Sequence, residues 1–170
     1  GDFLLISYQK YLFVIIFKRI LHAISIRMIL AFDTYYFDNK AKTACVAFET
    51  WDSENLVRLY TEINDNFEEY VSGEFYKREL PLILSLFKKI KFENIEATII
   101  DGFVYLDDDK KLGLGGHLYK ALDEKIPVIG VAKTSYSSIN KLKRTLFRGG
   151  SKKPLYITSV GIEPDKASEL

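Results

Sequence analysis

The sequence predicts one α/β domain in which a mixed sheet is flanked by helices. Three observations predict this class. A chain of 170 residues with 48% apolar content can build one substantial core and is too short for two domains of ordinary size. Three strand-like segments follow one another at residues 28–33, 43–50 and 55–63. Helical and buried-strand patterns then alternate, an order that places helices on the faces of a sheet.

The three early segments predict an antiparallel meander. Residues 28–33 form a short apolar run that ends in Asp33, and the turn-forming pair Asp38 and Asn39 follows after three aromatic residues. Residues 43–50 suit a second strand. Residues 55–63 alternate apolar with polar positions imperfectly, as a third strand does.

The second half alternates helices with buried strands. Residues 78–90 place apolar side chains at helical spacing, with Pro81 expected in the first turn. Residues 97–100 form a continuous apolar run, typical of a central strand, which stops at Asp101 and Gly102. Residues 112–122 predict a further helix, and residues 127–132 and 155–160 predict two more strands. A ribonuclease H-like sheet fits this order, as do several other arrangements.

The first 27 residues differ from the rest. Residues 3–26 are strongly apolar, but basic residues such as Lys10, Lys18 and Arg19 leave no uninterrupted stretch of about 18 residues to span a bilayer. We therefore predict an extension at residues 1–27, a domain at residues 28–170 and no membrane partner. Two readings of this extension are open. If the only methionine, Met28, is the natural start, residues 1–27 come from upstream sequence; otherwise they form a helix laid against the sheet.

Charge and cysteine content narrow the class of protein. The formal net charge of +1 excludes a polybasic binder, so any nucleic-acid site must be local. The single cysteine, Cys45, can form no internal disulfide and no thiolate zinc site, which fits a reducing, cytoplasmic location.

Two carboxylates are candidates for a metal site. Asp33 and Asp101 each follow a strongly apolar run, where a buried and unpaired carboxylate would be costly. On neighbouring strands they could coordinate Mg²⁺, which prefers oxygen ligands. A pair of ordinary turn acids would show the same pattern.

Other candidates accompany them. Glu79, expected at the start of a helix, either caps the helix or handles protons near the two acids. Lys133 follows a buried strand directly and could neutralise a phosphate, although surface lysines are common. Glycines beside His117 would let a nucleic-acid strand approach closely. Six basic residues between Lys141 and Lys153 form either a solvated surface or a phosphate-positioning loop.

Several segments together resemble the endonuclease V family, which acts at hypoxanthine arising from adenine deamination. The resemblance runs in family order over residues 28–161. It rests on Phe32-Asp33-Thr34-Tyr35, Tyr70-Val71-Ser72-Gly73, residues 75–81, Asp101-Gly102, residues 112–118, Ile129-Gly130-Val131-Ala132-Lys133 and residues 154–157.

The resemblance implies a function and a set of site residues. Asp33 and Asp101 would bind Mg²⁺, with Mn²⁺ as the substitute ion, while Glu79 and Lys133 would assist catalysis. Tyr70 would be an aromatic wedge at the lesion, and the substrate contacts would include Gly73, Gly113, Gly116 and His117. The implied reaction cuts inosine-containing DNA or RNA one nucleotide beyond the modified base, leaving a 3′-hydroxyl and a 5′-phosphate.

Departures from the family pattern leave alternatives open. Residues 103–111 replace the usual glycine and His-Pro-Arg stretch, Ser72 replaces the wedge proline, and residues 161–163 replace a Gly-His-Arg pattern. A nucleic-acid-binding module that has lost catalysis is the second hypothesis. An interaction protein that docks through residues 1–27 is the third. The oligomeric state is left open.

Overall fold

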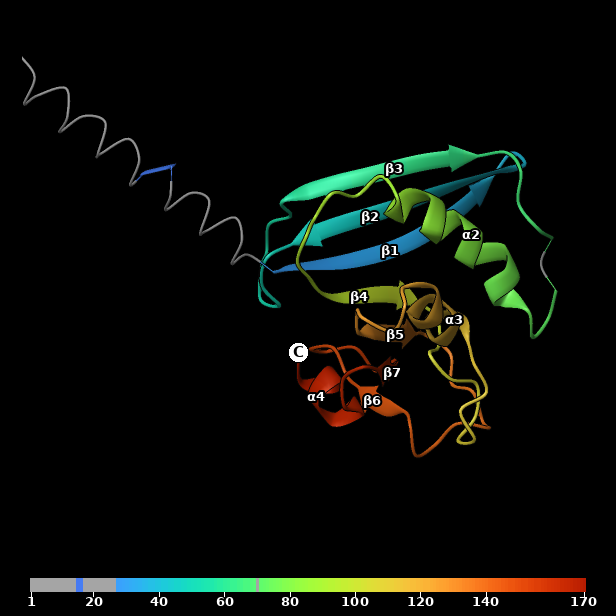
Figure 1. Ribbon diagram of the computed structural model, residues 1–170. Coiled ribbons are helices and arrows are strands. Elements are labelled where there is room, and N and C mark those ends of the chain that lie inside the picture. Colours follow the sequence, from blue (N-terminus) through green and yellow to red (C-terminus); the bar gives the residue numbers. More distant parts are fainter. Residues whose placement is uncertain (1–14, 17–26, 70) are drawn as a thin grey trace, which may run out of the picture.

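The computed structural model describes residues 15–16, 27–69 and 71–170. Its centre is a seven-stranded mixed sheet in the order β3-β2-β1-β4-β5-β7-β6 (Figure 1). The strands are β1 (Met28–Phe37), β2 (Lys40–Phe48), β3 (Arg58–Asn64), β4 (Ile95–Asp101), β5 (Val128–Ala132), β6 (Arg144–Leu146) and β7 (Leu155–Val160). The helices are α2 (Phe75–Phe87), α3 (Leu114–Ala121) and α4 (Pro164–Glu169).

The predicted meander is confirmed, with β2 antiparallel to both β1 and β3. The turn between β1 and β2 falls at the predicted pair. Asp38 and Asn39 have φ of 46° and 57°, the left-handed conformation that a two-residue hairpin turn requires and that these residue types tolerate.

The prediction that a strand ends at Asp33 is wrong. β1 continues to Phe37, because residues 33–37 stay paired with residues 40–44 of β2. The parallel neighbour β4 ends at Asp101. Asp33 therefore lies inside β1, at the point where β1 loses its partner on the β4 side.

The middle of the sheet is parallel. β4 runs parallel to β1 and to β5, whereas β7 returns antiparallel to β5 and pairs with β6. The predicted strands at 97–100, 127–132 and 155–160 are confirmed within one or two residues. Their continuous apolar runs suit strands that are covered on both faces.

Helix α2 begins earlier than predicted. It spans Phe75–Phe87, so Pro81 lies inside the helix and not in its first turn, and Glu79 does not cap the helix. Glu79 occupies a core-facing position together with Leu82, Ile83 and Leu86, all of which are buried. A carboxylate on the apolar stripe interrupts the sequence pattern, which is why periodicity alone placed the start too late.

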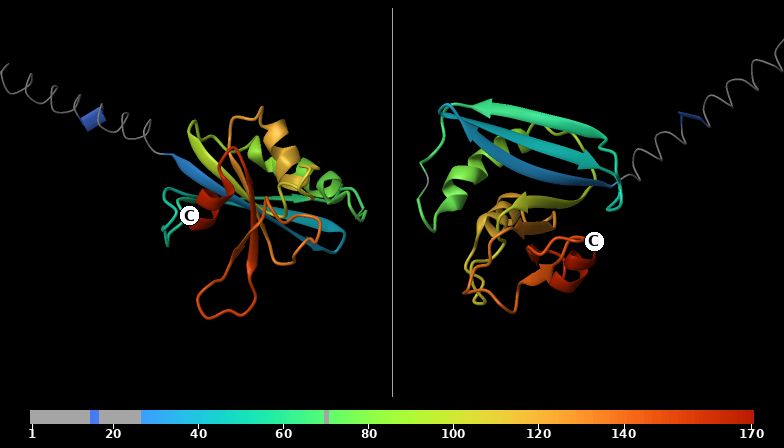
Figure 2. Two further views of the ribbon diagram at one scale, coloured as in Figure 1. Left: turned by 90° about the horizontal axis from the view of Figure 1, so that it is seen from below. Right: turned by 180° about the vertical axis from the view of Figure 1, so that it is seen from behind.

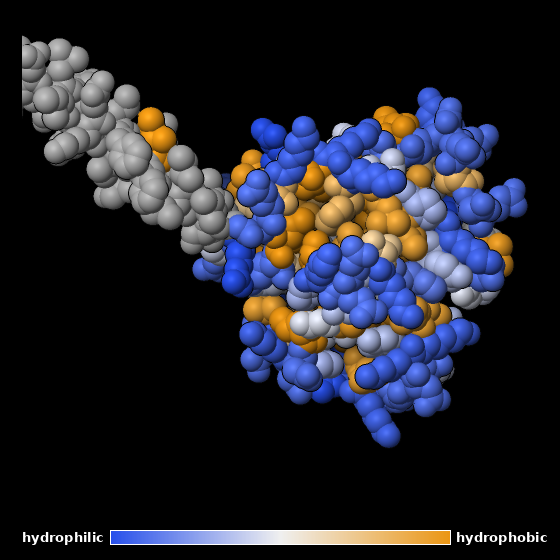
Figure 3. Space-filling model, viewed as in Figure 1, coloured by the Kyte–Doolittle hydropathy of each residue, from blue (hydrophilic) through white to orange (hydrophobic). Residues whose placement is uncertain are grey.

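Helices cover both faces of the sheet (Figures 1 and 2). The main core lies between the sheet and helices α2 and α3, and its centre includes Leu30, Ile100 and Leu118. Helix α4 packs on the opposite face, where Ala167 joins a cluster with Ile129 and Ile157. On the face seen in Figure 1, apolar residues gather in the middle, between β3 and β4, and hydrophilic residues surround them (Figure 3).

Cys45 is fully buried in the main core, and burial raises the pKa of its thiol to about 12. It is therefore a structural residue and not a reactive thiol.

Two short elements, β6 and α4, have no clear signal in the sequence. The three-residue β6 and six-residue α4 were not predicted, since neither is long enough to show a clear period.

The predicted helix within residues 1–27 lies outside the described residues, apart from Ile15 and Ile16. Among the described residues, no helix combines the length and the apolar character needed to cross a bilayer.

Candidate active site

Asp33 and Asp101 lie side by side. Phe32 pairs with Ile100 across the parallel strands β1 and β4, so the next residue of each strand is one of the two acids. Neighbouring strands are about 4.8 Å apart, which brings the two carboxylates within reach of one ion. Asp33 also accepts a hydrogen bond from the backbone N–H of Thr34 at 2.9 Å, which restrains its side chain.

A small pocket joins these acids to a third. Asp33, Glu79 and Asp101 all line one pocket of about 40 Å³, together with the apolar side chains of Phe75, Ile83 and Leu114 among others. Burial raises the pKa of Asp101, the ammonium of Lys133 opposes that rise, and the neighbouring carboxylate of Asp33 adds to it. Two like charges held together in this way favour a bound cation.

Glu79 is held in place from the sheet. Its side chain is 5% exposed, and its Oε1 accepts a hydrogen bond from the hydroxyl of Tyr36 at 2.6 Å. The guanidinium carbon of Arg78 lies 3.5 Å from the centroid of the Tyr36 ring. Burial raises the pKa of Glu79, while hydrogen bonds from Tyr36 and Thr34 and the charge of Arg78 oppose the rise. Sequence reasoning missed Tyr36, because only the fold brings β1 against α2.

Glu79→Gln is expected to stabilise the metal-free protein at neutral pH. The pKa of Glu79 is higher in the folded than in the unfolded chain, so the folded state binds more protons between these two values. Stability therefore falls as pH rises through that window, and it stays low above the folded pKa. Glutamine can still accept from Tyr36 but carries no charge.

Urea unfolding in EDTA checks this expectation. The midpoint of Glu79→Gln should exceed that of the unmodified protein at pH 8, and the difference should shrink towards pH 4. The exposed Glu69→Gln serves as the control and should show no such pH-dependent gain. A variant less stable than the parent at pH 8 would show that the carboxylate is not strained.

Lys133 lies directly after β5, as predicted. Its Nζ lies 4.0 Å from Asp101 Oδ2, and both side chains are largely exposed, at 79% and 53%. Such an ion pair is weak in water, so the ammonium remains free to meet a phosphate.

A second pocket of about 440 Å³ opens beside the acids and shares Asp101 with the first. One of its walls includes Gly73, Phe75 and Tyr76, and the other runs from Lys133 to Tyr136. Phe103 also lines this pocket, with its ring centroid 5.9 Å from that of Tyr136 in an edge-on contact. An aromatic-lined cavity next to a carboxylate pair suits a planar ligand.

The predicted substrate contacts fall into three groups. Gly73 and Gly113 line the larger pocket. Gly116 and His117 do not: Gly116 is packed under the backbone of Val104, and His117 stacks on Tyr76 with ring centroids 3.7 Å apart. The close approach that Gly116 permits is thus made by the protein's own backbone. Tyr70, the predicted wedge, lies outside the described residues.

Asp108 holds one wall of the larger pocket, a role that the sequence did not indicate. Its Oδ1 accepts hydrogen bonds from the backbone N–H groups of Asn140, Lys141 and Leu142 at 3.0, 2.8 and 3.3 Å. These bonds, with that of Asn140 first, hold the pKa of Asp108 below its usual value. Nearby, Ser138 Oγ donates to Leu106 O at 2.6 Å. The segment that departs from the family pattern therefore anchors the loop after Lys133.

Asp108→Ala is expected to loosen this loop without unfolding the sheet. The amides of residues 140–142 should exchange with solvent at least about tenfold faster, because local opening no longer breaks three hydrogen bonds. Hydrogen exchange followed by mass spectrometry measures this. Asp109→Ala, at the exposed neighbour, should leave the same amides unchanged. Equal exchange in both variants would contradict the anchoring role.

The donor set fits a divalent cation. Asp33 and Asp101 offer carboxylate oxygens, Glu79 lines the same pocket, and Mg²⁺ is commonly held by one or two carboxylates together with several waters. Within the described part of the chain, no three His, Cys, Asp or Glu side chains gather closely enough to form a complete protein-only metal group. A site of two carboxylates completed by water is consistent with both observations.

Asp165 stands apart from these acids. It lies in α4, which packs on the face of the sheet opposite α2 and α3. Its carboxylate forms an ion pair with Arg144, whose Nη2 donates to Asp165 Oδ2 at 3.1 Å. Asp165 is thus held by a residue of β6, which stands three places from β4 in the order of the sheet.

Fold and site together define a ribonuclease H-like α/β domain with carboxylates at the edge of its central parallel strands. The family model described as Endonuclease V matches residues 15–164. The chain belongs to the endonuclease V family, a family of nucleases. A search of curated proteins finds no match to its sequence.

Solved structures show the same fold. Human ENDOV is 18% identical, with 85% of this chain and 74% of that chain covered and a TM-score of 0.66. Endonuclease V from Bacillus subtilis is 21% identical over 86% and 71% of the two chains, with a TM-score of 0.63. A Ciona intestinalis endonuclease V in complex with a 23mer DNA containing an inosine is 17% identical over 85% and 76%, with a TM-score of 0.69. The predicted fold class is thereby confirmed.

Proposed function

We propose that this chain is a Mg²⁺-dependent endonuclease that hydrolyses a phosphodiester bond near hypoxanthine in DNA or RNA. The observation that carries the proposal is the adjacency of Asp33 and Asp101 beside an aromatic-lined pocket of about 440 Å³. Family membership and the inosine-containing DNA bound by the Ciona intestinalis protein support the choice of base.

Each residue of the site has a role in this proposal. Asp33 and Asp101 hold the cation, which supplies charge neutralisation at the phosphate and activation of water when it is bound. Lys133, weakly paired in the free protein, meets the charge that develops on the phosphate oxygens. Glu79 lines the same pocket, and burial raises its pKa, which suits a group that accepts and releases a proton.

The larger pocket would select the base. An enzyme that acts beside a modified base commonly extrudes it into a pocket and reads its edge and its faces. Phe75 and Phe103 supply apolar surface there, and Gly113 also lines the wall. Because Asp101 lines both pockets, a base held in the larger one places its own backbone near the carboxylates.

A nucleic-acid-binding module without catalysis is the second candidate. Two observations favour it: no complete three-ligand metal group is present among the described residues, and Asp165 is engaged by Arg144. Such a protein would bind inosine-containing strands and leave them intact.

A cleavage assay separates the two candidates. Matched DNA and RNA strands carrying inosine or adenosine at one position are incubated with the protein, with Mg²⁺ or with EDTA. Cleavage confined to inosine strands with Mg²⁺ is the expected result. Binding without cleavage would favour the second candidate, and neither binding nor cleavage by folded protein would reject both.

A further inference from the structure

The two walls of the larger pocket continue into segments of opposite charge. Residues 126–162 contain seven Lys and Arg and no Asp or Glu, whereas residues 62–76 contain five Asp and Glu and no Lys or Arg. The first segment supplies the wall at Lys133, and the second supplies the wall at Gly73. A near-neutral protein therefore has a strong charge difference across its site.

The basic segment carries a loop that leaves the sheet at the same edge as the acids. Asp101 pairs with Val131, and Val131 pairs with Ile157 of β7. Strand β7 begins only two residues before Ile157, at Leu155, which pairs with Leu146 at the end of β6. The connection at residues 147–154 thus starts at the same edge of the sheet as the candidate active site and projects away from the body of the protein (Figure 2, left).

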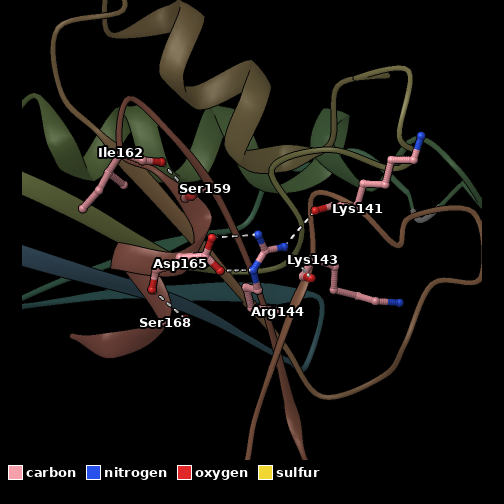
Figure 4. A network of polar contacts seen from close by, with 7 residues as sticks. All are labelled: Lys141, Lys143, Arg144, Ser159, Ile162, Asp165 and Ser168. Carbon is pink, nitrogen blue, oxygen red and sulfur yellow. Dashed lines mark hydrogen bonds and ion pairs between the residues drawn. The ribbon is translucent and has the colours of Figure 1, made fainter.

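The base of this loop is fastened on both sides. Lys143 donates to Ser135 Oγ at 2.8 Å and to Tyr136 O at 3.0 Å, which ties the loop to the pocket wall. Arg144 donates to Lys141 O at 2.8 Å and is paired with Asp165 on its other side (Figure 4). The charged groups of Lys143 and Arg144 are therefore already bonded within the protein, and these bonds fix the direction in which the loop leaves the sheet.

The tip of the loop is different, because its basic groups face solvent. Arg148, Lys152 and Lys153 are exposed, and none of them takes part in an ion pair among the described residues. Phe147, in the same loop, is 62% exposed, so its ring is available to a ligand. An exposed aromatic ring in the same loop as solvent-facing basic groups is the composition of surfaces that bind a single nucleic-acid strand.

We propose that residues 147–153 form a second contact that holds one unpaired nucleic-acid strand leaving the active site. Phe147 stacks on a base, and Arg148, Lys152 and Lys153 bind phosphates. This inference rests on the proposed function for the identity of the ligand. A single strand fits this contact better than a duplex, because the segment that leads into the opposite wall carries the exposed acids Asp65, Glu68 and Glu69, which would repel the phosphates of a second strand.

Binding by the full chain in EDTA tests the contact without involving catalysis. Fluorescence anisotropy measures Kd for labelled DNA and RNA single strands that contain no inosine. Phe147→Ala is expected to weaken binding about tenfold, the scale of one lost stacking contact, and Phe147→Trp should restore it. Replacing Arg148, Lys152 and Lys153 by Ala should lower the slope of log affinity against log salt by about 2.

A charge-matched control excludes a general effect of net charge. Lys88, Lys91 and Lys125 are exposed and belong to segments that precede the starts of β4 and β5, at the opposite edge of the sheet. Replacing all three by Ala removes the same charge and should leave Kd within about twofold and the salt slope unchanged, since no phosphate contact is lost. Equal weakening by both triple variants would overturn the proposal.

Strand choice is measured with the same probes. The unmodified protein should bind a single strand at least about tenfold more tightly than the matching duplex, and replacing Asp65, Glu68 and Glu69 by Asn and Gln should reduce that ratio. An unchanged ratio would contradict the role of the acidic wall. Because these strands lack inosine and no metal is present, failure here is distinct from failure of inosine cleavage by the unmodified protein.

Discussion

Replacing Asp33 or Asp101 with asparagine is expected to slow inosine-dependent cleavage by about 10³-fold or more, the scale on which loss of a charge-stabilising group acts at an active site. Each substitution keeps the shape of the side chain and removes one of the two adjacent charges that attract the cation. The fold should survive, since burial and the neighbouring Asp33 already raise the pKa of Asp101 and its ionised form is under electrostatic strain.

Single-turnover cleavage at saturating protein measures this effect. Thermal unfolding in EDTA should show no loss of stability in either variant. Asp52→Asn, at an exposed loop position, is the matched control and should cleave at the rate of the unmodified protein. Full activity in both Asp33→Asn and Asp101→Asn would remove the carboxylate pair from the mechanism.

Gly130→Ala is expected to destabilise the fold by about 3 kcal/mol, the upper part of the range for an overpacked core. Gly130 lies in β5 between Ile100 and Thr158 of the neighbouring strands. An added Cβ would collide with the carbonyl oxygen of Gly102 and lie 2.8 Å from Thr158 Oγ1. It would also push apart the buried hydrogen bond in which the N–H of Val104 donates to that hydroxyl at 2.9 Å.

Equilibrium unfolding in urea gives the change in free energy directly. Gly150→Ala is the control, because nothing lies within 4 Å of its added Cβ, and its effect should stay within about 0.5 kcal/mol. A Gly130→Ala variant as stable as the control would mean that the turn after Asp101 does not close over β5.

Much of the fold was predictable because its signals are local. The turn at Asp38 and Asn39 depends on residue types that tolerate positive φ, and the apolar runs at 97–100 and 127–132 reflect burial on both faces. The sequence also named Asp33 and Asp101 as a candidate pair on neighbouring strands, but their adjacency comes from the parallel pairing of β1 with β4 and not from a strand end at Asp33.

The remaining features depend on partners that are distant in sequence. β1 continues past Asp33 only because β2 returns beside it, and the start of α2 was placed too late because buried Glu79 interrupts its apolar stripe. The hydroxyl of Tyr36 that holds Glu79, and the anchoring of residues 140–142 by Asp108, join segments more than 30 residues apart. Local periodicity carries no information about such contacts.

The most direct measurement is the anomalous density of a crystal soaked in Mn²⁺, an ion that can stand in for Mg²⁺ and is visible to X-rays. One strong peak bridging the carboxylates of Asp33 and Asp101 is the predicted result. A peak only elsewhere, or acids that point to different sides of the molecule with no ion between them, would contradict a shared cation and the hydrolysis proposed to depend on it.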